Sequence, residues 1–208
     1  MDFTELVSPA RLEAAAALRE LGHAFVGHEV DDAVFERVTK LVAEVLPEFE
    51  AGRPRSRPED AMKMRQFEEA PADGETMDHF PDCVVSGAAN PMGIAIQVHR
   101  EGDDAVVSVS LGSAFEGAPA RSHGGIVAAI FDDAMGFVLS MERTPAYTGR
   151  LTVSYLAPTP IQVPIEFRCR LRSREGRKLF IEGEATHEGT RLAEAEGLFI
   201  AIPPERLV

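Results

Sequence analysis

The sequence predicts an α+β fold, in which an antiparallel sheet wraps around one long central helix and a helical extension comes first. From residue 80 onward the chain alternates apolar and polar residues as strands do, and one long apolar segment, 124–141, interrupts this texture. Residues before 70 instead repeat apolar positions at helical spacing. Strands, one helix and then a strand meander are the order of an antiparallel α+β domain. We therefore divide the chain into a helical extension, 1–75, and a main domain, 76–208.

Two amphipathic helices are expected in the extension. Ser8 and Pro9 are a favourable N-cap and first residue for the first helix. The second helix carries one apolar stripe and is expected to end at Pro47. Residues 51–58 form a basic linker broken by prolines, and a short helix over Ala61–Phe67 is expected to follow. We expect the helices to pack on the main domain or on a partner subunit, and we assign no chemistry to them.

The main domain is expected to begin with a hairpin that turns at Gly102-Asp103-Asp104. A loop rich in Gly, Ala, Ser and Pro, 112–122, separates this hairpin from the central helix. A single curled sheet leaves one face and one edge exposed, so a homodimer or a dimer of dimers is expected. The predicted strands are 94–99 and 105–111 before the helix, and about 147–156, 162–174, 177–187 and 191–202 after it.

The central helix is apolar almost all the way round, so we expect it to be buried on all sides. Asp132 and Asp133 are the exception, and a buried carboxylate is costly unless it is paired. Adjacent helical residues point about 100° apart, so the two acids cannot share one role. Asp132 follows Gly125 by close to two turns and faces nearly the same side as the helix start. The alternative is that both acids reach solvent or an arginine such as Arg150.

The triplet His123-Gly124-Gly125 marks the start of this helix. Backbone N–H groups at a helix start lack partners within the helix, and the helix dipole is positive there. Glycines allow a substrate to approach the backbone closely. This geometry suits an oxyanion site that polarises a carbonyl such as that of a thioester. The alternative is an ordinary loop-to-helix turn with a capping histidine.

Composition and charge argue against several classes of partner. The net charge of −13 makes nucleic acid and anionic membrane surfaces poor partners. Cys83 and Cys169 form no CxxC pair, the histidines show no metal-ligand spacing, and we predict no metal site. The first residues lack the features of a signal peptide, and no apolar run reaches the ~20 residues of a membrane span. We therefore expect a cytoplasmic protein.

Several of these motifs together resemble a known family. Phe115-x-Gly117, then His123-Gly124-Gly125, an acid nine residues after the histidine, and Gly136 resemble the PaaI-like hotdog thioesterases. The resemblance covers about residues 78–203 and implies the hotdog fold. The downstream segments are similar to the THEM branch of that family: Thr148-Gly149-Arg150-Leu151-Thr152-Val153-Ser154-Tyr155, Glu175-Gly176-Arg177-Lys178 and Glu194-Ala195-Glu196-Gly197-Leu198-Phe199-Ile200.

The resemblance implies an acyl-CoA thioesterase with a carboxylate-based site. Asp132 takes the position of the catalytic acid, which attacks the thioester carbon or activates a water that does so. The Gly124 N–H, with Gly125 as a second donor, polarises the thioester carbonyl, and His123 orients the loop. Thr148 takes the position of a hydroxyl that places the attacking water, and we expect it to act from the partner subunit. Asp133 is interpreted as structural.

The resemblance also bears on substrate binding. Arg177 and Lys178 resemble a contact with the CoA phosphates, although a solvated turn is the simpler interpretation. Gly117 stands where many PaaI-like enzymes carry Asn or Gln, as it does in the THEM branch. CoA is part of the substrate, and no cofactor is expected.

Two other functions compete with hydrolysis. A non-catalytic acyl-CoA-binding protein would bind CoA without turnover, and Gly117 keeps this alternative open. A hotdog dehydratase relies on a histidine within a different motif, and the spacing from His123 to Asp132 argues against it.

Overall fold

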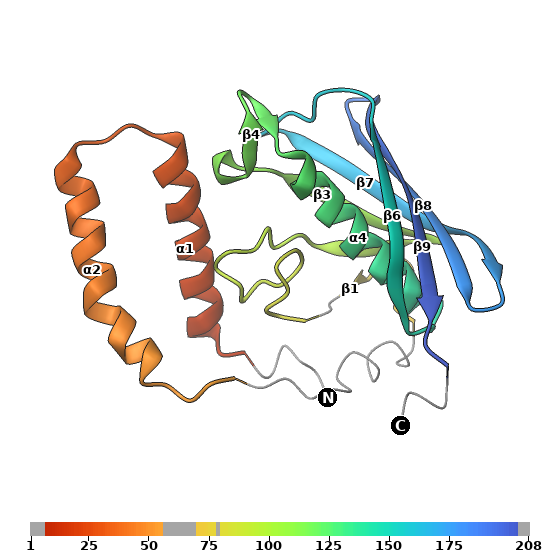
Figure 1. The fold of residues 1–208 in the computed structure, drawn as a ribbon, viewed down its shortest axis with the longest axis horizontal. Helices are drawn as coiled ribbons and strands as arrows, with labels where there is room; N and C mark the ends of the chain where they lie inside the picture. Colours follow the sequence, from red (N-terminus) through yellow and green to blue (C-terminus); the bar gives the residue numbers. More distant parts are fainter. Residues whose placement is uncertain (1–6, 56–69, 78–79, 204–208) are drawn as a thin grey trace.

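The computed structural model describes residues 7–55, 70–77 and 80–203. A seven-stranded antiparallel sheet curves around α4 (Gly124–Met141), and the helical pair α1 (Pro9–Gly27) and α2 (Asp32–Glu50) lies beside this domain (Figure 1). The predicted α+β layout, with one central helix and a helical extension, is confirmed.

The sheet has the strand order β1-β2-β3-β7-β8-β9-β6, and every neighbouring pair is antiparallel. Within the described sheet, β6 pairs with β9 alone, so its other edge is open. A small two-stranded sheet precedes α4 and is formed by β4 (Glu116–Ala118) and β5 (Arg121–Ser122). The strands of the large sheet are β1 (Thr76–Met77), β2 (Val98–Glu101), β3 (Asp104–Ser110), β6 (Ala146–Tyr155), β7 (Pro164–Glu175), β8 (Lys178–His187) and β9 (Thr190–Ala201).

The four strands after α4 begin and end within two residues of the predicted positions. β2 is shorter than predicted, because it begins at Val98 rather than at residue 94. Ala95 has a φ of 59°, a left-handed conformation that a strand cannot contain. The N–H groups of Ile94 and Ile96 donate instead to carbonyls of the loop at 84–85. Cys83, next to that loop, contacts Asp133 of α4.

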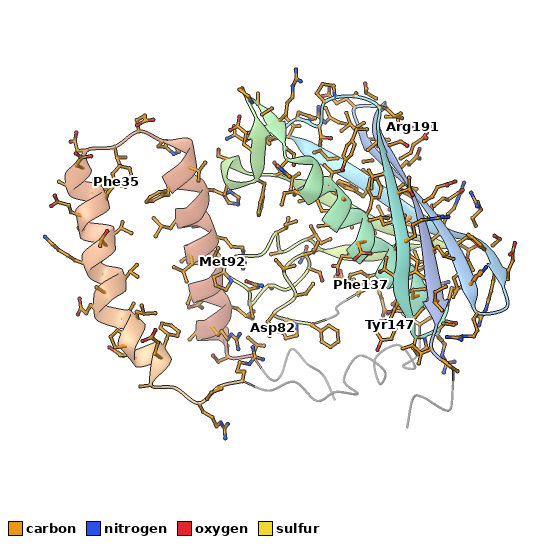
Figure 2. The ribbon with its side chains drawn as sticks, viewed as in Figure 1. Phe35, Asp82, Met92, Phe137, Tyr147 and Arg191 are labelled. Atoms are coloured by element: carbon orange, nitrogen blue, oxygen red, sulfur yellow. The ribbon has the colours of Figure 1, made fainter. Side chains whose placement is uncertain are left out.

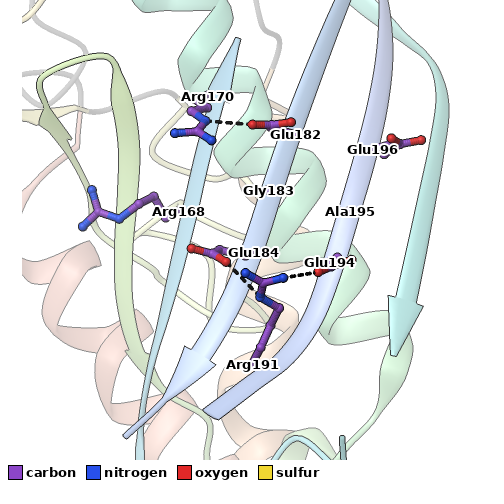
Figure 3. A pocket seen from close by; sticks show the side chains of 9 residues that line it. All are labelled: Arg168, Arg170, Glu182, Gly183, Glu184, Arg191, Glu194, Ala195 and Glu196. Carbon is purple, nitrogen blue, oxygen red and sulfur yellow. Dashed lines mark hydrogen bonds and ion pairs between the residues drawn. The ribbon is translucent and has the colours of Figure 1, made fainter. Parts of the chain in front are cut away.

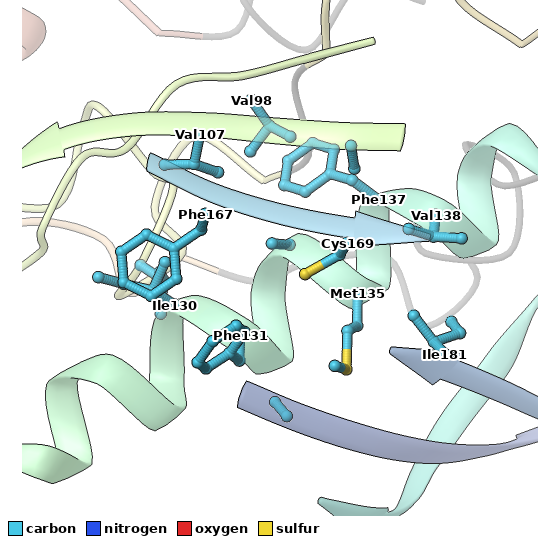
Figure 4. Packing of buried hydrophobic residues seen from close by; sticks show 14 of the residues in the cluster. Val98, Val107, Ile130, Phe131, Met135, Phe137, Val138, Phe167, Cys169 and Ile181 are labelled. Carbon is cyan, nitrogen blue, oxygen red and sulfur yellow. The ribbon is translucent and has the colours of Figure 1, made fainter. Parts of the chain in front are cut away.

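One face of α4 packs on the sheet, and the large side chains of that face form the core (Figure 4). Phe131 of α4 meets Phe167 of β7 edge to face, with ring centroids 5.1 Å apart. The prediction that α4 is buried on all sides is wrong for the single chain. Ala128, Asp132 and Gly136 are only half-buried, because the sheet covers one side of the helix and leaves the other partly open.

By length and composition α4 is also the one helix in the described part of the chain that could span a membrane. The sequence analysis found no apolar run of the ~20 residues that a membrane span needs. Val127, Ile130 and Met135 are fully buried in the core of the sheet. Core packing therefore accounts for the apolar sequence of α4.

The extension is a helical pair of which only α1 packs closely on the main domain. Ser8 caps α1 as predicted, and its hydroxyl accepts a hydrogen bond from the Arg11 N–H. Phe35 of α2 contacts Phe25 of α1 edge to face, with ring centroids 5.1 Å apart (Figure 2). No residue of α2 is buried.

The prediction that Pro47 ends the second helix is wrong, since α2 continues to Glu50. A proline removes one N–H donor, but this one lies in the last turn of an exposed helix, where water can bind the freed carbonyl. The predicted short helix over Ala61–Phe67 lies outside the described residues.

Candidate active site

A cleft of about 510 Å³ opens at the N-terminal end of α4. The β4–β5 hairpin, the first turn of α4 and the segment after β6 surround it. Gly117, His123 and Gly124, which the sequence analysis singled out, line the cleft together with Arg121 and Tyr155. The structure thus gathers the predicted loop residues around one opening.

His123 is the N-cap of α4. Its Nδ1 accepts a hydrogen bond of 2.9 Å from the Gly125 N–H, and its own N–H donates to the Phe115 carbonyl at 2.9 Å. Because Nδ1 is an acceptor, the neutral imidazole carries its proton on Nε2. The Gly125 N–H is already engaged, whereas the Gly124 N–H has no acceptor among the described residues. Gly124 is therefore the better placed of the two predicted donors.

Tyr155, at the end of β6, is a cleft residue that the sequence analysis did not single out. Its hydroxyl donates a hydrogen bond of 2.7 Å to the Gly124 carbonyl. Its ring lies against Gly124 so closely that an added Cβ would come within 3.2 Å of the ring. Tyr155 belongs to a segment that resembles the THEM branch, but no pattern along the chain pairs it with Gly124. That contact depends on how β6 folds back along α4.

Gly117 has no room for a side chain in this backbone. A Cβ built on it would lie 2.8 Å from the Cα of His123, because the β4–β5 hairpin packs directly on the N-cap. An Asn or Gln at Gly117 would therefore displace the turn that holds His123. The glycine at this position, where many PaaI-like enzymes carry Asn or Gln, is therefore consistent with the close packing of the hairpin.

Asp132 lies on the partly open side of α4 and is paired with Thr148. The Thr148 hydroxyl donates a hydrogen bond of 2.8 Å to Asp132 Oδ1. The pairing of β6 with β9 is irregular between Thr148 and Arg150, directly beside this contact. The sequence analysis expected Thr148 to act from a partner subunit, whereas this bond is made within one chain. The reason is that β6 follows α4 after a short turn and runs back alongside it.

Asp133 points into a different environment. The Cys83 thiol donates to Asp133 Oδ1 at a distance of 3.5 Å. Ser86 lies nearby, but neither its hydroxyl nor Asp133 Oδ2 has a partner with hydrogen-bond geometry among the described residues. Burial raises the pKa of Asp133, while Ser86 and Cys83 lower it in part and the charge of Asp132 raises it further. The alternative that both acids reach solvent or Arg150 does not describe Asp133.

The remaining predicted residues lie at the far end of α4. Arg177 and Lys178 form the hairpin between β7 and β8, and Arg177 Nε donates to the Ala201 carbonyl at 2.9 Å. With a rise of 1.5 Å per residue, the end of α4 is roughly 25 Å from Gly124. Asp132 is about 12 Å from Gly124 by the same measure. The single chain therefore separates the carboxylate, the helix start and the basic hairpin.

A second hollow lies on the outer face of the sheet, on β7, β8 and β9 (Figure 3). Its charges are mutually satisfied, with Arg170 Nε 2.8 Å from Glu182 and Arg191 Nε 3.1 Å from Glu184. Paired charges on an exposed face are typical of a solvated surface rather than of a ligand site. Within the described residues, no group of three His, Cys, Asp or Glu side chains is arranged to hold a metal ion.

Part of the chain is similar to known thioesterases. Residues 122–194 match the family model of the thioesterase superfamily. The chain is 33% identical over 93 residues to acyl-coenzyme A thioesterase THEM4 from Mus musculus, which covers 44% of this chain and 40% of that relative. THEM4 from Bos taurus is 33% identical over 97 residues, which covers 46% of this chain and 40% of the relative. The matched region thus spans less than half the length of these curated relatives.

The crystal structure of a thioesterase superfamily protein superposes on this chain with a TM-score of 0.79 at 22% identity. The superposition covers 93% of this chain and 92% of the other, so the likeness of fold extends beyond the matched domain. The chain therefore has the hotdog fold, and its residues 122–194 are similar to the thioesterase superfamily. The predicted resemblance to the THEM branch of the PaaI-like thioesterases is confirmed for the matched part of the chain.

Proposed function

We propose that this protein is an acyl-CoA thioesterase that hydrolyses an acyl-CoA to a carboxylic acid and CoA. The observation that carries the proposal is the 2.8 Å hydrogen bond from the Thr148 hydroxyl to Asp132 on the partly open side of α4. That bond occupies Oδ1 and leaves Oδ2 of Asp132 available to act on a water molecule or on the substrate. The THEM4 relatives, which are named as acyl-coenzyme A thioesterases, support the choice of substrate class.

The proposed site is shared between two subunits. A thioester carbon and its oxygen are directly bonded, so the group that attacks and the group that polarises cannot be about 12 Å apart as Asp132 and Gly124 are in one chain. A two-fold axis near the midpoint between these residues would set two α4 helices antiparallel. Gly124 of one protomer would then stand level with Asp132 of its partner. The open edge of β6 and the partly exposed side of α4 are the surfaces that such a homodimer would cover.

The chemistry needs only groups that the chain carries. Water attacks the thioester carbon while Asp132 accepts its proton, and the carbonyl oxygen becomes an oxyanion. The Gly124 N–H at the positive end of α4, with the Nε2–H of His123 beside it, stabilises that oxyanion. The tetrahedral intermediate then breaks its C–S bond, and the CoA thiolate leaves and takes up a proton. Direct attack by Asp132, with an anhydride hydrolysed afterwards, would use the same groups.

CoA is proposed to reach the cleft across the same interface. In the antiparallel arrangement, the Arg177-Lys178 hairpin of one protomer lies beyond the α4 start of the other. The positive charges of Arg177 and Lys178 are then placed to bind the CoA phosphates while the flexible pantetheine arm leads to the cleft. In the same dimer, Tyr155 shields one side of the polarising N–H group from water.

The test is release of the CoA thiol from a panel of acyl-CoAs of increasing chain length, measured for the wild type and for Asp132→Asn. We expect turnover by the wild type and a loss of about 10³-fold in kcat/KM for Asp132→Asn, the usual scale for removal of a general base. Asp103→Asn, in the exposed turn between β2 and β3, is the matched control and should keep full activity. Saturable CoA binding without turnover on any chain length would instead establish a non-catalytic acyl-CoA-binding protein.

A further inference from the structure

The helical extension touches the segment that leads into the cleft. His23 on α1 lies against the 3₁₀ turn η2 (Ser113–Phe115). Its Nδ1 accepts a hydrogen bond of 3.1 Å from the Ala114 N–H. Its ring meets the Phe115 ring edge to face, with centroids 5.0 Å apart. One side chain of the extension therefore holds both the backbone and a side chain of this turn.

This 3₁₀ turn also positions the N-cap of α4. The Phe115 carbonyl accepts the hydrogen bond from the His123 N–H, and Phe115 also packs on the hydrophobic core. β4 begins directly after the turn, and its hairpin with β5 leads to His123. His123 in turn binds the Gly125 N–H and so fixes the first turn of α4. Two hydrogen bonds and one short peptide segment thus connect His23 to the Gly124 N–H.

The contact depends on close approach at two glycines. A Cβ on Gly112 would come 2.5 Å from Nδ1 of His23, and a Cβ on Gly27 would come 2.8 Å from the Ser113 hydroxyl oxygen. The buried Ser113 hydroxyl also accepts a hydrogen bond of 3.1 Å from the Gln162 side chain. The turn is therefore clamped from both sides, by α1 and by the segment after β6.

The acceptor role requires a neutral imidazole, because a protonated histidine donates from both nitrogens. Burial lowers the pKa of His23, and the charge of Arg19 on the same helix lowers it further. The turn that packs against His23 contributes only Ser113, Ala114 and Phe115, none of which titrates. The contact is therefore complete above the ordinary pKa range of histidine and is lost as the pH falls through the lowered pKa.

We infer that His23 is a positioning residue of the active site, which acts through the turn at 113–115 on the His123 cap and the Gly124 N–H. This inference rests on the proposed thioesterase function and adds to it a role for the extension. Arg19 of α1 makes a parallel contact, since its guanidinium donates to the carbonyls of Ala88 and Asn90 at 2.8 Å each. α1 thereby contacts both the turn before the cleft and the loop that begins at Cys83. The Cys83 thiol in turn donates to Asp133 of α4.

The first test is independent of activity. Hydrogen–deuterium exchange of the full-length protein, followed by mass spectrometry, reports on peptides that cover residues 112–125. In His23→Leu, which keeps the bulk but loses the acceptor, these peptides should exchange about five- to tenfold faster. His23→Asn, whose Oδ1 can replace Nδ1 as an acceptor, should restore most of the protection. The exposed His28 ends the same helix, so His28→Leu is the matched control and should leave these peptides unchanged.

The second test uses acyl-CoA hydrolysis. A misplaced oxyanion donor should lower kcat by about 10- to 100-fold in His23→Leu with a smaller change in KM. Because Asn does not titrate, His23→Asn should retain a larger fraction of its neutral-pH kcat below pH 6 than the wild type does. Exchange and kcat of His23→Leu equal to those of the wild type, or faster exchange spread evenly over the chain, would overturn the inference. A wild type without hydrolysis would refute the proposed function, while the exchange test would still decide whether His23 positions the turn.

Discussion

Asp132 and Asp133 are neighbours in the sequence, yet they occupy two different regions of the molecule. Asp132 faces the partly open side of α4 and accepts a hydrogen bond from a hydroxyl on β6. Asp133 faces the loop beneath the helix and accepts a hydrogen bond from the thiol of Cys83. The step of about 100° between successive helical residues produces this separation. A carboxylate on this helix becomes a candidate for catalysis or for structure according to the element that it faces.

The difference also extends to charge. Burial raises the pKa of Asp133, so its environment favours the neutral acid. Asp132, by contrast, accepts a hydrogen bond from the Thr148 hydroxyl and has an open side from which water can approach. We infer that Asp133 anchors the loop under α4, whereas Asp132 is free to take part in a reaction.

Among substitutions that distinguish the surroundings of Asp132 from those of Asp133, we expect the largest effect at Thr148. Thr148→Ala removes the only donor to Asp132 among the described residues. We expect kcat for acyl-CoA hydrolysis to fall about 10- to 100-fold, the worth of one hydrogen bond to a charged group. Thr148→Ser keeps the hydroxyl and should stay within a few fold of the wild type. Steady-state kinetics of the two variants measure the contrast, and equal activity of Thr148→Ala and wild type would contradict the role given to this bond.

The sequence predicted part of this difference between Asp132 and Asp133. Periodicity and the resemblance to a family identified α4 and singled out Asp132, and α4 begins and ends where predicted. The apolar pattern did not say which side of α4 the sheet covers, because residues on both sides are apolar. The environment of Asp133 depends on Cys83 and Ser86, fifty or so residues away in the chain. Contacts of that range depend on tertiary packing, and local patterns do not contain them.

The same distinction between local sequence motifs and long-range contacts applies to the cleft. His123, Gly124 and Gly117 were predictable because they form a short local motif. Tyr155 and His23 were not, because they reach that motif from β6 and from α1. The sequence analysis expected Thr148 to act from the partner subunit, whereas its hydroxyl binds Asp132 of the same chain. One sequence does not show which protomer supplies a neighbouring strand.

A smaller effect, on stability rather than on activity, is expected at Asp133. A carboxyl group whose pKa is raised by folding holds its proton more tightly in the folded state. It therefore destabilises the fold as the pH rises above the ordinary range of aspartate. Asp133→Asn removes this penalty, so its melting temperature relative to the wild type should increase from pH 4 to pH 8. Each kcal/mol of penalty removed corresponds to roughly 2–4 °C for a chain of this size.

Thermal unfolding of Asp133→Asn and the wild type across that pH range measures the effect. The amide oxygen can keep the bond from Cys83, and the amide nitrogen can donate toward Ser86, so the substitution leaves no new buried group without a partner. A melting temperature of Asp133→Asn that falls relative to the wild type as the pH rises would instead show that Asp133 is ionised and stabilised by its surroundings.

The smallest effect is expected at Cys83, which connects the loop to α4. Its thiol donates to Asp133, and its sulfur accepts a weak hydrogen bond from the Val85 N–H at 3.4 Å. Cys83→Ala removes both bonds but little volume, so we expect a loss of about 1 kcal/mol of stability. Activity should stay within about twofold, because Cys83 faces Asp133 and not Asp132. Chemical denaturation measures the first quantity and thiol release from acyl-CoA the second. A loss of activity comparable with that of Thr148→Ala would mean that the two carboxylates act as one unit, which the separation across α4 argues against.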